Sequence, residues 1–280
     1  MRFSALITIL RPVNAVVSGL TAVLALLIAT GTIGPASILL FLIVLCITGA
    51  GNVINDYFDA GIDRVNCPDR PIPSGAVGER TALVYSLLLF LVGILLSFFT
   101  NIICIAIAVI NSLLLIWYSA RLKGVPLAGN LAVSYLAGSI FLFGAALGGT
   151  AGLILVLPIT AITFLGTLAR EMIKDVEDMD GDAAGGAATL PLIIGVRRTA
   201  ISAFIVLGFA ICFSIIPVYT WGLWYLVMIV PVDILILSAG LTALPCTTAR
   251  CMRDTKAATL LKAGMFAALA VFTVSAVFLG

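Results

Sequence analysis

Residues 55–63 read NDYFDAGID, and residues 174–182 read KDVEDMDGD. Three aspartates in each stretch have spacings of three and four residues, and the two sets stand 119 residues apart: Asp56, Asp59 and Asp63, then Asp175, Asp178 and Asp182. The second stretch also contains Asp180. After each stretch, a proline precedes the end of an Arg-Thr-Ala tripeptide by nine residues. The two stretches therefore predict an internal repeat.

The composition places the chain in a membrane. Of its 280 residues, 62% are hydrophobic and 10% are charged, and the mean hydropathy is +1.25, whereas soluble domains are about 25% charged. The formal net charge of +2 gives no electrostatic support for nucleic-acid binding. We therefore predict an all-α integral membrane protein.

Apolar runs of about 20 residues can cross a bilayer as helices. The chain contains nine, near residues 12–30, 36–58, 79–99, 101–118, 127–148, 152–174, 199–218, 222–244 and 258–279. The first lacks a cleavage site of small residues, which favours a membrane helix over a signal peptide. Every Lys and Arg lies near the N-terminus, in alternate connections or at the helix ends beside them. The positive-inside rule then predicts a cell-membrane protein with the N-terminus and these connections in the cytoplasm and the C-terminus outside.

The repeat aligns the first four predicted helices with the next four. In a single domain of residues 1–280, the pseudo-repeats cover about 1–120 and 121–244, and the final helix covers about 258–279. Each repeat crosses the membrane an even number of times, so the repeats are parallel and both aspartate clusters reach one face. We expect a site at the interface between the two halves.

The spacing within each cluster predicts a metal site. Positions i, i+4 and i+8 share one stripe of a helix, and carboxylates stacked near a helix C-terminus repel one another and oppose the helix dipole. Mg²⁺ offsets this with oxygen ligands and also recruits phosphate oxygens, as in phosphoryl-transfer sites. The predicted ligands are Asn55, Asp56, Asp59, Asp63, Asp175, Asp178 and Asp182.

Basic side chains beside both clusters are predicted to bind diphosphate, because guanidinium and ammonium groups bind phosphate well. They are Arg64, Arg70, Lys123, Arg170 and Lys174. The alternative is that cytoplasmic basic residues only determine topology. That alternative is preferred for Arg197, Arg198, Arg250, Arg253 and Lys256.

Asp233 is the one acid of thirteen that lies away from the predicted cytoplasmic face. A carboxyl near the middle of a membrane helix faces the protein interior or water. Asp233 and Asn14 are therefore candidates for a substrate cavity, and a structural hydrogen bond is the alternative for Asp233. The absence of histidine and of CxxC pairs argues against the usual zinc and haem sites. We interpret the six cysteines as small buried apolar residues.

At these residues the sequence resembles the UbiA superfamily of intramembrane prenyltransferases. The family motif NDxxDxxxD is matched by residues 55–63, and its motif DxxxD by Asp178 and Asp182. RPIPSG at residues 70–75 resembles the family's connection after the first motif, and Tyr118 with Lys123 resembles its tyrosine-and-lysine motif. The resemblance covers essentially the whole chain and implies the UbiA-type fold.

The resemblance implies Mg²⁺-dependent ionisation of an allylic prenyl diphosphate, followed by attack of an acceptor nucleophile. It implies catalytic roles for Asp59, Asp63, Asp178, Asp182, Lys123 and Tyr118. Residues 170–195 are similar to the branch that makes archaeal ether lipids. There a geranylgeranyl group passes from geranylgeranyl diphosphate to the free glycerol hydroxyl of geranylgeranylglyceryl phosphate. The implied partners are a prenyl diphosphate, a lipid-like acceptor and membrane lipid.

Three other functions compete with this one. An aromatic acceptor, as in quinone or chlorin biosynthesis, is compatible with RPIPSG, which also resembles those branches. A secondary transporter with a parallel repeat would need polar residues across the membrane thickness. A CDP-alcohol phosphotransferase would carry DGxxAR, whereas Asp180 and Gly181 are followed here by DAAG.

Overall fold

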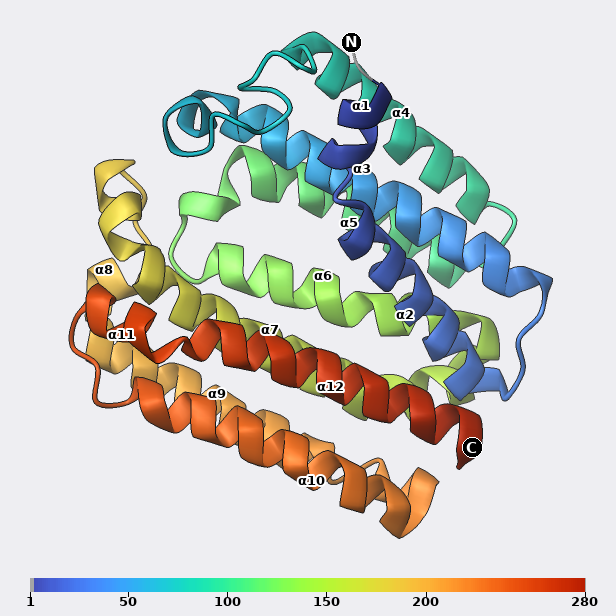
Figure 1. Cartoon of the computed structure of the whole chain (residues 1–280). Coiled ribbons are helices and arrows are strands. Elements are labelled where there is room, and N and C mark those ends of the chain that lie inside the picture. The colour runs from blue at the N-terminus through green and yellow to red at the C-terminus, as the bar shows by residue number, and fades with distance from the viewer. Residues whose placement is uncertain (1–2, 280) are drawn as a thin grey trace. The chain divides into compact units, whose positions relative to one another are not determined.

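The computed structural model describes residues 3–279, without the side chains of residues 3, 65, 66 and 184. Its long helices (Figure 1) are α2 (Pro12–Thr30), α3 (Pro35–Asn66), α4 (Glu79–Ser97), α5 (Ile102–Ala120), α6 (Ala128–Ala145), α7 (Gly149–Ala184), α9 (Val196–Ser214), α10 (Val218–Ala243) and α12 (Ala257–Phe278). The short elements are α1 (Phe3–Ile9), α8 (Leu190–Ile194), α11 (Ala249–Thr255) and the 3-10 turns η1 (Leu122–Gly124) and η2 (Ala146–Gly148). Residues 3–279 contain no β-strand, so the all-α prediction is confirmed.

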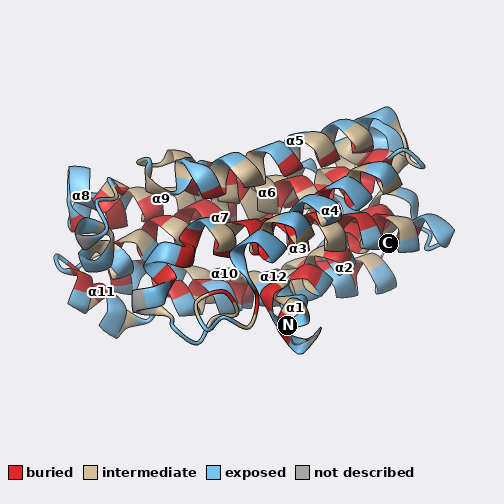
Figure 2. Cartoon of the chain, turned by 90° about the horizontal axis from the view of Figure 1, so that it is seen from above, coloured by how far each residue is buried: buried red, intermediate tan, exposed pale blue. Residues whose placement is uncertain are grey.

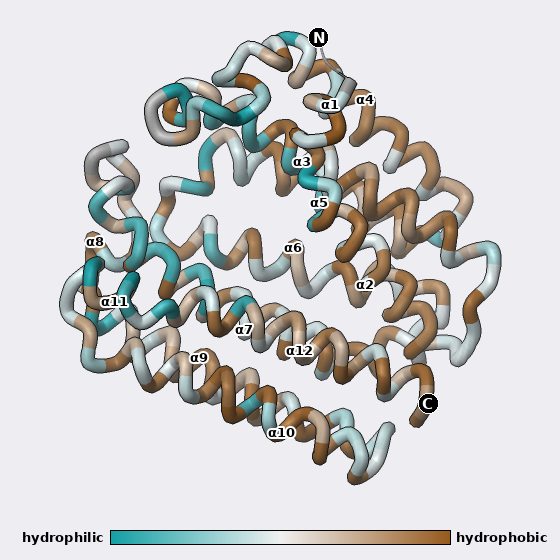
Figure 3. The backbone as a smooth tube through the Cα atoms, viewed as in Figure 1, coloured by the Kyte–Doolittle hydropathy of each residue, from teal (hydrophilic) through white to brown (hydrophobic). Residues whose placement is uncertain are grey.

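Eight stretches of the described chain are long and apolar enough to cross a membrane. The longest, Ala128–Ala183, contains both α6 and most of α7, which are separated by η2. Gly149, the first residue of α7, has a φ of 65°. The chain is thus a multi-pass membrane protein, and the nine predicted crossings are compatible with this helix order. Figure 3 shows hydrophobic residues along the long helices and hydrophilic residues gathered at helix ends and connections.

Helices α3 and α7 extend past the predicted spans 36–58 and 152–174 and carry the aspartate clusters within the helix. Helix α3 has 32 residues and α7 has 36, which correspond to about 48 Å and about 54 Å of length. The hydrocarbon core of a bilayer is only about 30 Å thick. The extra turns carry Asp59, Asp63 and the whole second cluster past the predicted spans.

The chain forms two compact units. Unit 1 contains α1 to α5 and residues 140–154, and unit 2 contains residues 123–139 and those from 155 onward. In unit 1, α3 packs against α2, α4 and α5. Gly93 of α4 allows close contact with Ile47 of α3, because a Cβ there would lie 2.7 Å from the Ile47 side chain. The predicted pseudo-repeats remain a prediction.

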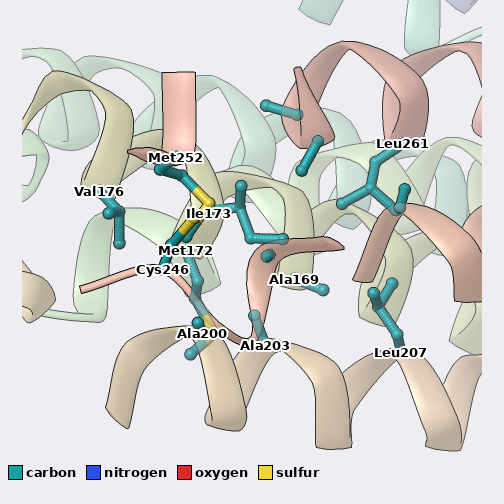
Figure 4. Packing of buried hydrophobic residues seen from close by; sticks show 14 of the residues in the cluster. Ala169, Met172, Ile173, Val176, Ala200, Ala203, Leu207, Cys246, Met252 and Leu261 are labelled. Atoms are coloured by element: carbon teal, nitrogen blue, oxygen red, sulfur yellow. The ribbon is translucent and has the colours of Figure 1, made fainter. Parts of the chain in front are cut away.

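In unit 2 the core forms among α7, α9, α10, α11 and α12. Figure 4 shows Ile173 of α7 packed close to Met252 of α11 and to Cys246. The long helices each have buried and exposed faces (Figure 2), and many of the exposed side chains are large and apolar, as expected for lipid contact.

The interpretation of all six cysteines as small buried apolar residues is wrong. Cys246 and Cys251 form a disulfide with a Cα–Cα distance of 5.5 Å, and Cys212 is exposed. The turn between α10 and α11 brings the two thiols together, which the sequence separation alone does not reveal.

Candidate active site

The first aspartate cluster lies on the last turns of α3, and two arginines partly neutralise it. Asp56, Asp59 and Asp63 are 4%, 8% and 6% exposed. Arg11 Nη2 donates to Asp56 Oδ1 at 2.6 Å, and Arg70 Nη1 donates to Asp63 Oδ2 at 2.6 Å. Arg70 also lies 3.7 Å from Asp56. These contacts offset the repulsion between the buried carboxylates.

The connection between α3 and α4 positions Arg70. Its residues Ile72 and Val77 pack against Ala60 of α3, which holds this loop over the end of the helix. Burial disfavours the charged guanidinium, but the hydrogen bond and charge of Asp63 raise the pKa of Arg70 above its ordinary value. The RPIPSG stretch therefore supplies a permanent cation to the cluster.

The second aspartate cluster lies on the last turns of α7 and is more exposed. Lys174 Nζ lies 3.4 Å from Asp178 Oδ2, with the two side chains 48% and 55% exposed. This contact follows the predicted i, i+4 stripe. Asp175 is half-buried, and its Oδ2 accepts a hydrogen bond from Asn130 Nδ2 of α6 at 2.8 Å.

Two more predicted cations lie near this second cluster. Lys123, in η1, and Asp182 are near enough for their charges to interact. Arg170 pairs through Nη1 with the neighbouring Glu171, and its buried Nε has no hydrogen-bond partner among the described residues. A buried N–H in this state gains from a ligand oxygen that accepts it.

Two other predicted residues have partners outside the clusters. Arg64 pairs with Glu79 at 2.6 Å in an exposed position. Asp233 Oδ2 lies 2.6 Å from Ser214 Oγ, which is the kind of hydrogen bond that the structural alternative for Asp233 requires. The remaining predicted residues are exposed or half-buried: Asn14 on α2, Asn55 on α3 and Tyr118 on α5.

Three residues near the clusters were missed by the sequence-based prediction. They are Arg11, Asn130 and Arg253. Arg253 Nη1 donates to the Glu177 carbonyl of α7 at 2.6 Å, and Nη2 lies 3.2 Å from Asp180 Oδ2. A signal for the other two exists in the sequence, because Arg11 and Asn130 stand 119 residues apart, the offset of the clusters themselves.

The donor atoms present fit a hard divalent cation. Asp59 and Asp63 lie one turn apart on α3, and Asp178 and Asp182 lie one turn apart on α7. Among the described residues, no three acidic or sulfur side chains gather to hold a metal by themselves. Mg²⁺ suits such sites because it usually keeps several waters and takes one or two carboxylates together with substrate phosphates.

The chain is similar in sequence to one known protein family and to named relatives. The sequence pattern of the UbiA prenyltransferase family matches residues 16–253. A digeranylgeranylglyceryl phosphate synthase of Methanoculleus marisnigri is 54% identical over 278 residues, which cover 99% of this chain and 100% of the relative. A protein of the same name from Methanoregula boonei is 55% identical over 271 residues, 97% of each chain.

Solved structures match as well. One that concerns digeranylgeranylglyceryl phosphate synthase in membranes has a TM-score of 0.85 and 33% identity, and covers 98% of both chains. A UbiA homolog from Archaeoglobus fulgidus bound to GPP and Mg²⁺ has a TM-score of 0.62 and 17% identity, and covers 96% of this chain and 100% of the homolog. The second match shows similarity of fold alone.

Proposed function

This chain belongs to the UbiA prenyltransferase family, and we propose that it transfers a geranylgeranyl group from geranylgeranyl diphosphate to the free glycerol hydroxyl of geranylgeranylglyceryl phosphate. The product carries two geranylgeranyl ethers on one glyceryl phosphate, as archaeal membrane lipids require. The observation that carries this choice of substrates is the 54% and 55% identity to two archaeal synthases over nearly the whole chain.

The proposed metal is Mg²⁺, which when bound supplies positive charge to the diphosphate through oxygen ligands. The residues of unit 1 that would hold Mg²⁺ are Asp59 and Asp63, with the amide of Asn55, and those of unit 2 are Asp178 and Asp182. The proposal follows from the spacing of these oxygen donors and from the burial of the first pair, which must be compensated by positive charge.

The cations of this chain stabilise the leaving group in the proposed reaction. As the bond between C1 and the diphosphate oxygen breaks, negative charge grows on the diphosphate. Arg70, Lys123, Lys174 and the unsatisfied Nε of Arg170 are the donors proposed to meet it, together with Tyr118. Arg64 is already paired with Glu79, so its proposed part requires that exposed pair to open.

In the proposed reaction, the apolar tails of both substrates lie at the depth of the membrane. Geranylgeranyl tails are apolar, and burying each methylene contributes about 0.8 kcal/mol. The acceptor then needs only its glyceryl phosphate near the polar helix ends. We propose that these ends and the N-terminus face the cytoplasm, because the basic residues gather in the connections on that side.

Product analysis tests the proposal directly. Purified protein in liposomes receives labelled geranylgeranyl diphosphate and Mg²⁺, with either geranylgeranylglyceryl phosphate or 4-hydroxybenzoate, and products are identified by mass spectrometry. We expect the digeranylgeranyl product from the first acceptor only, and none after chelation of the metal. Transfer to 4-hydroxybenzoate alone would instead assign an aromatic acceptor.

Matched variants test the residues. Asp59→Asn and Asp178→Asn should each lower kcat by at least about 100-fold, the loss expected when one stabilising group of the transition state is removed. Asp254→Asn, an exposed acid of α11, is the control and should keep the wild-type rate. A near-normal rate for both cluster variants would exclude these carboxylates from the site.

A further inference from the structure

The same hydrogen bond occurs once in each unit. In unit 1, Arg11 Nη2 donates to Asp56 Oδ1 at 2.6 Å. In unit 2, Asn130 Nδ2 donates to Asp175 Oδ2 at 2.8 Å. The partners are 45 residues apart in both cases. A shift of 119 residues converts the first pair into the second.

A close helix contact recurs at the same offset. A Cβ on Gly19 of α2 would lie 3.1 Å from the backbone oxygen of Phe41 in α3, and a Cβ on Gly138 of α6 would lie 3.1 Å from the backbone oxygen of Thr160 in α7. Residues 19 and 138 differ by 119, as do residues 41 and 160. The helix that precedes each acid-bearing helix therefore crosses it in the same register.

The backbone around Arg11 shows that its contact is well supported. Arg11 precedes α2 in the left-handed region, with a φ of 50°. A non-glycine residue in this region is strained and persists only where its surroundings hold it. Two contacts with α3 hold it here. Asn52 Nδ2 donates to the Leu10 carbonyl at 2.8 Å, and one turn later Asp56 accepts from Arg11.

Both hydrogen bonds run from a side-chain N–H to an aspartate carboxylate, but only one of the two donors is charged. The donor is a guanidinium in unit 1 and a neutral amide in unit 2. In both units, a side-chain N–H donates to the first aspartate of the cluster, Asp56 or Asp175. An ion pair would require a cation in both places, whereas a contact that positions a helix requires only the hydrogen bond.

We infer that Asp56 and Asp175 are positioning residues rather than metal ligands. Each ties the acid-bearing helix to the helix before it, and the metal ligands among the aspartates are the other two of each cluster. The inference rests on the proposed function and departs from the sequence-based prediction that all six aspartates bind metal. Asp63 also accepts a hydrogen bond, but its donor is Arg70 of the loop that follows α3, whereas the donors to Asp56 and Asp175 hold each acid-bearing helix against the helix before it.

Metal binding to isosteric variants separates the two roles. Mn²⁺ serves as the probe, and its binding to purified protein is measured by electron paramagnetic resonance. Asparagine keeps an acceptor oxygen for Arg11 or Asn130, so Asp56→Asn and Asp175→Asn should keep the Mn²⁺ affinity within about twofold of wild type. Asp59→Asn and Asp178→Asn should weaken it by about tenfold or more, because each removes an anionic ligand. A loss in Asp56→Asn or Asp175→Asn equal to that in Asp59→Asn would overturn the inference.

Variants of the donor test the positioning role itself. Arg11→Gln keeps an N–H donor but removes the positive charge beside the buried Asp56, so it should lose less thermal stability and kcat than Arg11→Leu, which removes both. The Mn²⁺ affinity of Arg11→Leu should stay within about twofold of wild type. Wild-type stability and kcat in Arg11→Leu would overturn the inference. These results are distinct from failure of the proposed function, which would appear as wild-type protein that binds Mn²⁺ but forms no digeranylgeranyl product.

Discussion

Gly144, near the end of α6, lies so close to α2 that no space remains for a side chain at this position. A Cβ there would lie 2.1 Å from the Ala22 carbonyl oxygen and 2.7 Å from the Ala25 Cβ. The closest ordinary contacts of carbon with a carbonyl oxygen are about 3.3 Å, so Gly144→Ala must move one backbone away from the other by more than about 1 Å. Overpacking of this kind costs about 1–3 kcal/mol, and a gap of about 1 Å forfeits up to half of the dispersion attraction of the facing atoms.

The expected net loss for Gly144→Ala is about 2 kcal/mol, since the better helix propensity of alanine returns less than about 1 kcal/mol at a helix end. By the scaling for domains of 150–250 residues, this lowers Tm by about 4–8 °C. Thermal unfolding in detergent, followed by circular dichroism, measures the shift. Gly208→Ala in α9 is the control, because nothing lies within 4 Å of the position of its Cβ, and its Tm should stay level or rise. A Tm for Gly144→Ala equal to that of Gly208→Ala would refute the reasoning.

Two further perturbations act on polar contacts of unit 2. Ser214→Ala removes the hydroxyl that lies 2.6 Å from Asp233 and should cost about 1–3 kcal/mol. Adding Asp233→Leu should recover most of this loss, because replacing both partners by apolar groups can be nearly neutral; a double variant less stable than Ser214→Ala would contradict this. Arg253→Met removes a hydrogen bond to the Glu177 carbonyl and should cost about 1 kcal/mol. Hydrogen exchange of the last turns of α7 should then rise relative to wild type, but not in Arg250→Met, the exposed control on the same helix; equal exchange in the two variants would exclude Arg253 as a support for α7.

The membrane class, the helix order and the identity of the cluster-bearing helices could be predicted from the sequence. Hydropathy depends on what each residue is, and a run of apolar residues has one stable form in lipid, the helix. The stripe that joins Lys174 to Asp178 was predicted for the same reason, since both residues lie on one helix and helical geometry alone places them together. The resemblance to a known family added the chemistry that these local patterns do not specify.

Contacts between separate elements could not be predicted in this way. Arg64 and Arg70 follow Asp63 at short distances in the sequence, yet only Arg70 bonds to it. The difference arises because the connection after α3 folds back and buries Ile72 against the same helix.

By itself, then, the sequence determined that this protein spans a membrane on apolar helices and that two sets of carboxylates stand in equivalent places along it. Only the tertiary structure decided which partner each carboxylate has. Asp56 and Asp175 are bonded to residues 45 positions earlier in the chain, and the disulfide joins two cysteines across a turn. Helical periodicity extends only within one helix, whereas these bonds depend on how neighbouring helices cross and where small residues such as Gly19 and Gly138 let them approach.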